Sequence, residues 1–143
     1  MKKFVALLLV LITSAATLFA QNGVAFTKGL SWAQIKEKAK TEQRYIFVDT
    51  YTTWCLPCKE MEKEIFPQPA VGAFFNANFI NVALQLDVTK KDNEEVKRRY
   101  EDARYFLNTY KIRSFPTYLF FDPYGELVHT INGASSTGEE FIA

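Results

Sequence analysis

The hydrophobic pattern of the first twenty residues sets them apart from the rest of the chain. The chain begins with two lysines after its first residue, an unbroken apolar run spans residues 4–12, and small residues lead up to Ala20. This order is typical of a secretory signal peptide that is cleaved after Ala20. The alternative is an uncleaved anchor helix, but residues 4–20 are short for a hydrocarbon core of about 30 Å. We therefore expect a signal peptide over residues 1–20 and one domain over residues 21–143, with no stable membrane insertion after cleavage.

Helical and extended patterns alternate through the rest of the chain. Ser31 and Gln34 fit a capping box, and the apolar residues that follow fall on one face, so a helix is expected over about 32–41. The β-branched and aromatic run at 45–51 suits a buried strand. The other expected elements are a weak edge strand at 22–26, helices at 57–65 and 70–76, a strand at 80–86, a hairpin of strands 117–121 and 126–131 around Asp122-Pro123-Tyr124-Gly125, and a last helix from about Thr137.

A longer helix is expected between Asp92 and Tyr110. Asp92, with Glu95 three residues on, marks its start, and apolar residues then recur at spacings of three and four. The charged residues between them face outward, and a solvated surface explains them better than a partner site does.

This order of elements predicts an α/β architecture. A strand joined through a helix to the next strand implies a parallel crossover, whereas the closing hairpin adds antiparallel strands. We therefore expect a central mixed sheet of four to five strands flanked by helices.

Composition and charge narrow the function classes. The chain has 143 residues, of which 48% are hydrophobic and 23% charged, with a net charge of +1. Removal of residues 1–20 takes away two lysines and leaves 15 basic against 16 acidic residues, a net charge of −1. Such a balance provides no broad cationic surface, so no nucleic-acid partner is expected. Export also moves the only two cysteines out of the reducing cytosol.

The two cysteines stand where the buried strand hands over to a helix, in Trp54-Cys55-Leu56-Pro57-Cys58-Lys59. At a helix N-terminus, unpaired N–H groups and the helix dipole favour the thiolate, which makes Cys55 the better nucleophile. Cys58, one turn further on, is expected to resolve the mixed disulfide that Cys55 forms with a substrate.

Three other interpretations of this dithiol compete. A zinc site needs about four ligands, and the sole histidine, His129, lies on a distant strand. A purely structural bridge over so small a loop removes unfolded-state entropy worth on the order of 2 kcal/mol or less. Two inert buried thiols are the third, and they fit an exported chain poorly.

From about Tyr45 onward the chain resembles the thioredoxin superfamily, through the Trp-Cys-x-Pro-Cys-Lys motif and two further sites. Phe115-Pro116-Thr117 looks like the family's cis-proline loop, and Asn132-Gly133-Ala134 resembles its glycine turn. The resemblance implies a thioredoxin fold and a cis Phe115-Pro116 bond, with Trp54, Phe115 and Pro116 in contact with an extended substrate. The alternative is an ordinary trans proline that opens an edge strand.

Asp49, six residues before Cys55, matches the buried acid of many thioredoxins. A carboxyl group in such a strand has a raised pKa and takes a proton from Cys58 during resolution. The alternative is a strand-end aspartate in contact with water.

Residues 55–66 look most like exported thioredoxin-like proteins and the periplasmic C-terminal domain of the membrane thiol:disulfide interchange reductase. Three features depart from thioredoxin itself. The strand at 80–86 contains no lysine to face Asp49. We also expect a lengthened helix before the cis-proline loop and a truncated C-terminal helix.

The expected function is thus that of an exported protein-disulfide reductase or thiol:disulfide interchange enzyme, periplasmic or secreted, with Cys55 and Cys58 as its redox-active disulfide. No cofactor and no metal are expected. Its partners would be protein thiols and disulfides, together with a membrane electron donor. The alternative is a thioredoxin-fold binding or scaffolding protein whose disulfide is structural or vestigial.

Overall fold

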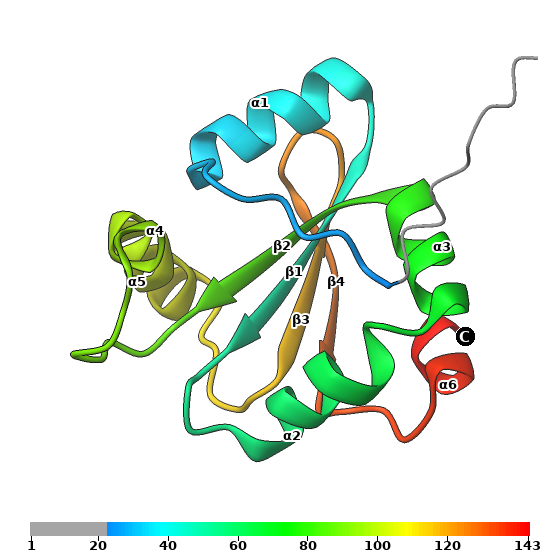
Figure 1. The fold of residues 1–143 in the computed structure, drawn as a ribbon. Helices are drawn as coiled ribbons and strands as arrows, with labels where there is room; N and C mark the ends of the chain where they lie inside the picture. Colours follow the sequence, from blue (N-terminus) through cyan, green and yellow to red (C-terminus); the bar gives the residue numbers. More distant parts are fainter. Residues whose placement is uncertain (1–22) are drawn as a thin grey trace, which may run out of the picture.

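The structure, a computed structural model, describes residues 23–143, so the predicted signal peptide lies outside the described residues. A four-stranded sheet lies between two layers of helices (Figure 1). In chain order the elements are α1 (Trp32–Glu42), β1 (Tyr45–Tyr51), α2 (Leu56–Glu60), a π-helical turn η1 (Met61–Ile65), α3 (Pro69–Asn78), β2 (Phe79–Gln85), α4 (Glu94–Arg98), α5 (Tyr100–Thr109), β3 (Thr117–Phe121), β4 (Leu127–Asn132) and α6 (Gly138–Ile142). Among these residues, no helix combines the length and the apolar character that a bilayer crossing requires.

The sheet is mixed, as the order of the elements predicts. Its strands lie in the order β2-β1-β3-β4, with β1 parallel to β2 and antiparallel to β3, and with β3 antiparallel to β4. The predicted bounds of the strand at Tyr45–Tyr51 are confirmed, as are the capping box of Ser31 with Gln34 and the hairpin between β3 and β4.

The weak edge strand predicted at 22–26 is reduced to one parallel bridge between Phe26 and Asn81. The backbone groups of Ala25, just before this bridge, bond to side chains rather than to a strand. The Ala25 N–H donates to Asn76 Oδ1 at 2.8 Å, and Asn81 Nδ2 donates to the Ala25 carbonyl at 3.3 Å. Two asparagine side chains therefore replace the ladder that a regular edge strand would make.

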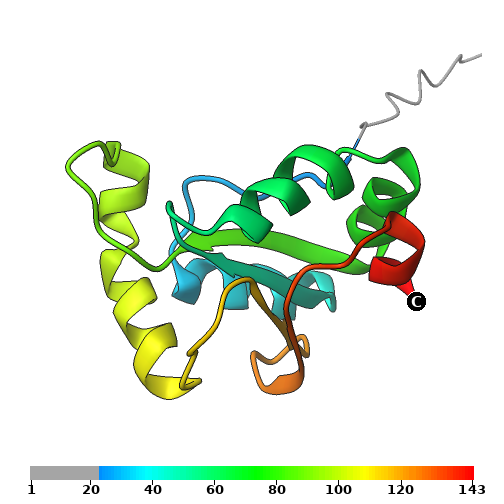
Figure 2. The ribbon, with the colours of Figure 1, turned by 90° about the horizontal axis from the view of Figure 1, so that it is seen from below.

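Both faces of β1 are buried, which explains its continuous apolar run. Ile46 and Val48 join the core between the sheet and the layer of α1 and α5, whereas Phe47 belongs to the core under η1, α3 and α6. Figure 2 shows the sheet nearly edge-on, with α2 on one side and α1 on the other. Because neighbouring strand residues point to opposite faces, Asp49 points to the same side as Phe47, toward the layer that carries α2.

The single helix predicted between Asp92 and Tyr110 is two helices. Asn93, not Asp92, caps α4, and the helical geometry breaks at Arg99, with φ −100° and ψ 6°. The Arg99 side chain turns inward there and donates to the carbonyl of Ala83 in β2 at 3.1 Å. A hydrogen bond from a charged residue to a distant strand thus accompanies the break. The spacing of apolar residues in the sequence does not indicate this bond.

Residues 23–27 cross α3 at very close range. The Val24 N–H donates to the Phe66 carbonyl at 2.8 Å, and the Thr27 N–H donates to the Asn81 carbonyl at 2.8 Å. A Cβ atom added to Gly72 would lie 2.4 Å from the carbonyl carbon and oxygen of Gly23. The crossing therefore requires glycine at position 72.

Gly72→Ala tests this crossing. An alanine in place of a helical glycine ordinarily stabilises a protein by about 1 kcal/mol. Here we expect a loss of about 1–3 kcal/mol in the free energy of unfolding, because the added methyl group meets backbone that cannot yield. Urea unfolding measures the change, with the exposed Ala73→Ser on the same helix as a control that should stay within about 0.5 kcal/mol. A stabilised Gly72→Ala would contradict the close crossing.

Candidate active site

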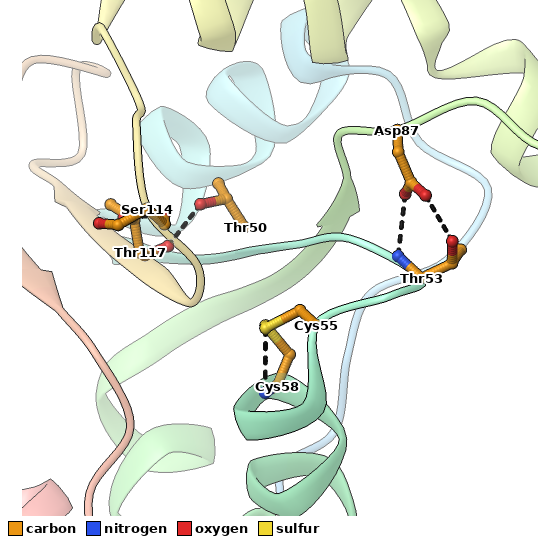
Figure 3. Close-up of a disulfide and its surroundings, with 7 residues drawn as sticks. All are labelled: Thr50, Thr53, Cys55, Cys58, Asp87, Ser114 and Thr117. Carbon is orange, nitrogen blue, oxygen red and sulfur yellow. Dashed lines mark hydrogen bonds between the residues drawn. A yellow bond between two sulfur atoms is a disulfide. The ribbon is translucent and has the colours of Figure 1, made fainter.

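The two cysteines form a disulfide just beyond the carboxyl end of β1. Cys55 caps α2, and Cys58 lies in its first turn. Their Cα atoms are 5.3 Å apart, and the Cys58 N–H donates to Cys55 Sγ at 3.2 Å (Figure 3). Both side chains are buried, with 3% of Cys55 and 7% of Cys58 exposed. The sulfur of Cys55 thus lies at the N-terminus of the helix, where backbone N–H groups stabilise negative charge.

The loop before Cys55 is held by an aspartate that the sequence analysis did not single out. The Thr53 N–H donates to Asp87 Oδ1 at 3.0 Å, and the Thr53 hydroxyl bonds to the other oxygen of the same carboxylate. Figure 3 shows both bonds on the opposite side of Cys55 from Thr117. Asp87 follows directly after the predicted strand at 80–86, and that position was the available signal for it.

The loop before β3 lies on the other side of the dithiol. The Phe115-Pro116 peptide bond is cis, as the resemblance implies. The Thr50 hydroxyl donates to the carbonyl of Thr117 at 2.6 Å, and the Gly133 N–H donates to the carbonyl of Pro116 at 2.9 Å. Bonds from β1 and from the glycine turn therefore fix this loop beside the cysteines.

Two aromatic rings border the disulfide. The Trp54 and Phe115 rings meet edge to face, with centroids 5.7 Å apart and planes at 88°. Trp54 is 66% exposed and Leu56 69% exposed, although both are large and apolar. Phe115 lies outside the ladder of β3, which begins at Thr117. The structure thus brings Trp54, Phe115 and Pro116 together around Cys55.

Asp49 is the one charged residue buried in the central strand. Only 6% of it is exposed, and its Oδ1 atom has no hydrogen-bond partner among the described residues. Its neighbour across β2 is Ala83, so no cation faces it from that strand. Burial raises the pKa of Asp49 from 3.8 to about 7, and the negative charge of Glu62 on η1 adds to the effect.

A cavity of about 500 Å³ lies beside Asp49 and Cys58. Its walls come from four stretches of the chain, namely residues 23–26, 49–53, 58–67 and 83. Most of its surface is apolar. Across residues 23–143, no cluster of three or more His, Cys, Asp or Glu side chains is arranged to hold a metal ion.

The chain is similar to known proteins in both sequence and structure. The sequence profile of the thioredoxin-like domain matches residues 32–143. The chain is 32% identical over 107 residues to the thiol:disulfide interchange protein DsbD of Klebsiella pneumoniae, a match that covers 74% of the chain but 16% of that protein. The chain thus spans about a sixth of the length of this curated relative.

Two solved structures are similar to this one. The solution structure of a proposed disulphide isomerase from Bacteroides thetaiotaomicron has a TM-score of 0.63 and 31% identity, covering 83% of this chain and 88% of that one. The oxidised C-terminal domain of DsbD from Neisseria meningitidis has a TM-score of 0.55 and 19% identity, covering 82% and 94% of the two chains. The Neisseria domain supports the fold alone.

The buried carboxyl group of Asp49 predicts that the protein becomes less stable as the pH rises. Between about pH 4 and pH 7, folded Asp49 keeps a proton that the unfolded chain has released, so the free energy of unfolding falls as the pH rises. In the oxidised protein, Asp49→Asn should therefore be more stable than the wild type at about pH 8, by an upper limit of about 4 kcal/mol, and the gain should shrink toward about pH 4.

Urea unfolding across this pH range measures the effect, and Glu64→Gln, which removes an exposed carboxyl group on η1, is the control. A pH profile of Asp49→Asn parallel to that of the wild type would show that the carboxyl group titrates normally.

Proposed function

The chain belongs to the thioredoxin-like domain family of disulfide oxidoreductases, and on that premise we propose that it is an exported enzyme that exchanges its Cys55–Cys58 disulfide with protein thiols and disulfides. The observation that carries the proposal is the position of Cys55 Sγ, at the N-terminus of α2 and beside the Phe115-Pro116 loop. A disulfide that only stabilises the fold requires neither the helix N-terminus nor the Phe115-Pro116 loop beside it.

The proposed reductase cycle begins with the reduced dithiol. The Cys55 thiolate attacks a substrate disulfide, a bond forms between Cys55 Sγ and one substrate sulfur, and the other substrate sulfur leaves with the electron pair and takes up a proton. Cys58 then attacks Cys55 Sγ, which forms the internal disulfide and releases the second substrate thiol. The substrate disulfide is reduced by two electrons, and the dithiol is oxidised by two. The reverse sequence oxidises a substrate.

Asp49 is proposed to take the proton that Cys58 loses in the second step. A buried thiol attacks poorly until it is deprotonated, and a carboxyl group with a pKa of about 7 can accept a proton at neutral pH. The environment supports this role, since Ala83 leaves Asp49 without a paired cation that would hold it ionised.

The exposed apolar surface around the disulfide is proposed to bind an extended segment of the substrate. Trp54 and Phe115 offer large aromatic faces with little conformational entropy to lose. The backbone of Phe115, which precedes β3, can pair with a substrate strand in the manner of strand addition.

Export and an electron source complete the proposal. The basic and apolar pattern of residues 1–20 supports delivery to the periplasm or the medium. A reductase outside the cytosol needs electrons from across the membrane, and we propose a membrane-bound donor as their source; the similarity to DsbD, a thiol:disulfide interchange protein, supports the exchange of disulfides with protein partners. No bound cofactor is proposed, because the dithiol itself carries the electrons.

Substitution of the two cysteines tests the exchange reaction. Cys58→Ser should stall after the first step, so the protein should accumulate disulfide-linked complexes with its substrates. A reductant should cleave these complexes. Cys55→Ser, the matched control, should form none and should lose reduction of a model protein disulfide entirely. Non-reducing gels and a reductase assay measure both effects. Full activity in Cys55→Ser, or no complexes with Cys58→Ser, would instead favour an inert disulfide in a binding or scaffolding protein.

A further inference from the structure

The cavity beside the disulfide contains two polar groups with unmet bonding capacity. Asp49 Oδ1 and Thr52 Oγ1 are both buried, both line the cavity, and neither has a hydrogen-bond partner among residues 23–143. Buried polar atoms in folded proteins are nearly always bonded to something. Because both atoms lie at one cavity, a single guest molecule with hydrogen-bond donors can bond to both.

The charge of the cavity indicates what kind of guest fits. Asp49, which is buried, and Glu62, which is exposed, both line it, and the pKa of Asp49 rises partly because Glu62 lies near. Lys59 is the cation of the cavity lining and is exposed like Glu62, but within the described part of the chain it makes no ion pair with either acid. The two carboxyl groups of the lining therefore have no ion-pair partner within residues 23–143.

Most of the remaining lining of the cavity is apolar. Val24, Phe26, Phe66 and Ala83 line the cavity, and the side chain of Ala83 is too small to fill the space opposite Asp49. A volume of about 500 Å³ falls within the range of small-molecule sites, which combine apolar walls with a few placed polar groups.

We propose that this cavity binds a small organic amine, with its ammonium group between Asp49, Thr52 and Glu62 and its apolar body against Phe26 and Phe66. An ammonium group donates three hydrogen bonds and accepts none, which matches two carboxylates and a hydroxyl oxygen. A bond from a charged donor to a buried carboxylate is among the stronger hydrogen bonds in proteins.

Other guests fit less well. A calcium ion takes six to eight oxygen ligands, whereas the lining has two carboxyl groups and three hydroxyl residues beside mostly apolar walls. An anion would meet Asp49 and Glu62 with the same sign of charge. Water alone could bond to Asp49 and Thr52, but it would leave the apolar walls wetted, so we treat a water-filled cavity as the outcome that contradicts the proposal.

Benzylammonium and its neutral counterpart, benzyl alcohol, test the site in the oxidised full-length protein at about pH 8. We expect benzylammonium to bind with a dissociation constant at least tenfold lower than that of benzyl alcohol, and to shift the amide resonances of Thr52 and Ala83 in an NMR titration. Asp49→Asn should remove that tenfold preference, Glu62→Gln should weaken it about threefold, and Glu64→Gln on the exposed face should leave it unchanged.

Equal affinity for the amine and the alcohol, or an unchanged preference in Asp49→Asn, would overturn the proposal. So would the absence of binding by both benzylammonium and cyclohexylammonium, which would leave a cavity filled by water only. Because the oxidised protein is used and no exchange is measured, binding of the amine to a chain that fails to exchange disulfides would refute the proposed function and keep this inference.

Discussion

Asp49 is a carboxyl group buried in the middle strand of the sheet without a cation to pair with, and its placement constrains the rest of the site. Ionisation in that position is costly, so the group keeps its proton until near neutral pH. The layers on both faces of β1 enforce the position, because Ile46 and Val48 pack into one core and Phe47 into the other. The strand cannot rotate to expose Asp49 without unpacking both cores.

The same strand positions the dithiol. Because β1 is anchored along its length, partly by the bond from Thr50 to Thr117 in β3, the loop that follows it starts from a fixed point, and Asp87 holds that loop through Thr53. Cys55 then falls at the start of α2, where the helix N-terminus favours a thiolate. The buried acid and the thiols are therefore parts of one rigid arrangement, and the cavity beside them is the space that Ala83 leaves open.

Local signals in the sequence predicted most of this fold. The apolar run at 45–51, the capping box at Ser31 and the turn at 122–125 each depend on neighbouring residues alone, and all three elements are found. The break at Arg99 and the bond from Thr53 to Asp87 were not predicted, because each joins residues far apart in the chain. Glu62 escaped notice for the same reason, since its proximity to Asp49 arises only when η1 packs over β1.

The central claim is that Asp49 takes the proton of Cys58 as the mixed disulfide resolves. The most direct measurement is the single-turnover rate of that step from about pH 5 to pH 9, followed by the fluorescence of Trp54 beside the disulfide. The account predicts a rate that rises with pH around a midpoint near 7, and a loss of about 100-fold together with that midpoint in Asp49→Asn. An Asp49→Asn variant that resolves at the wild-type rate with the same pH profile would contradict it.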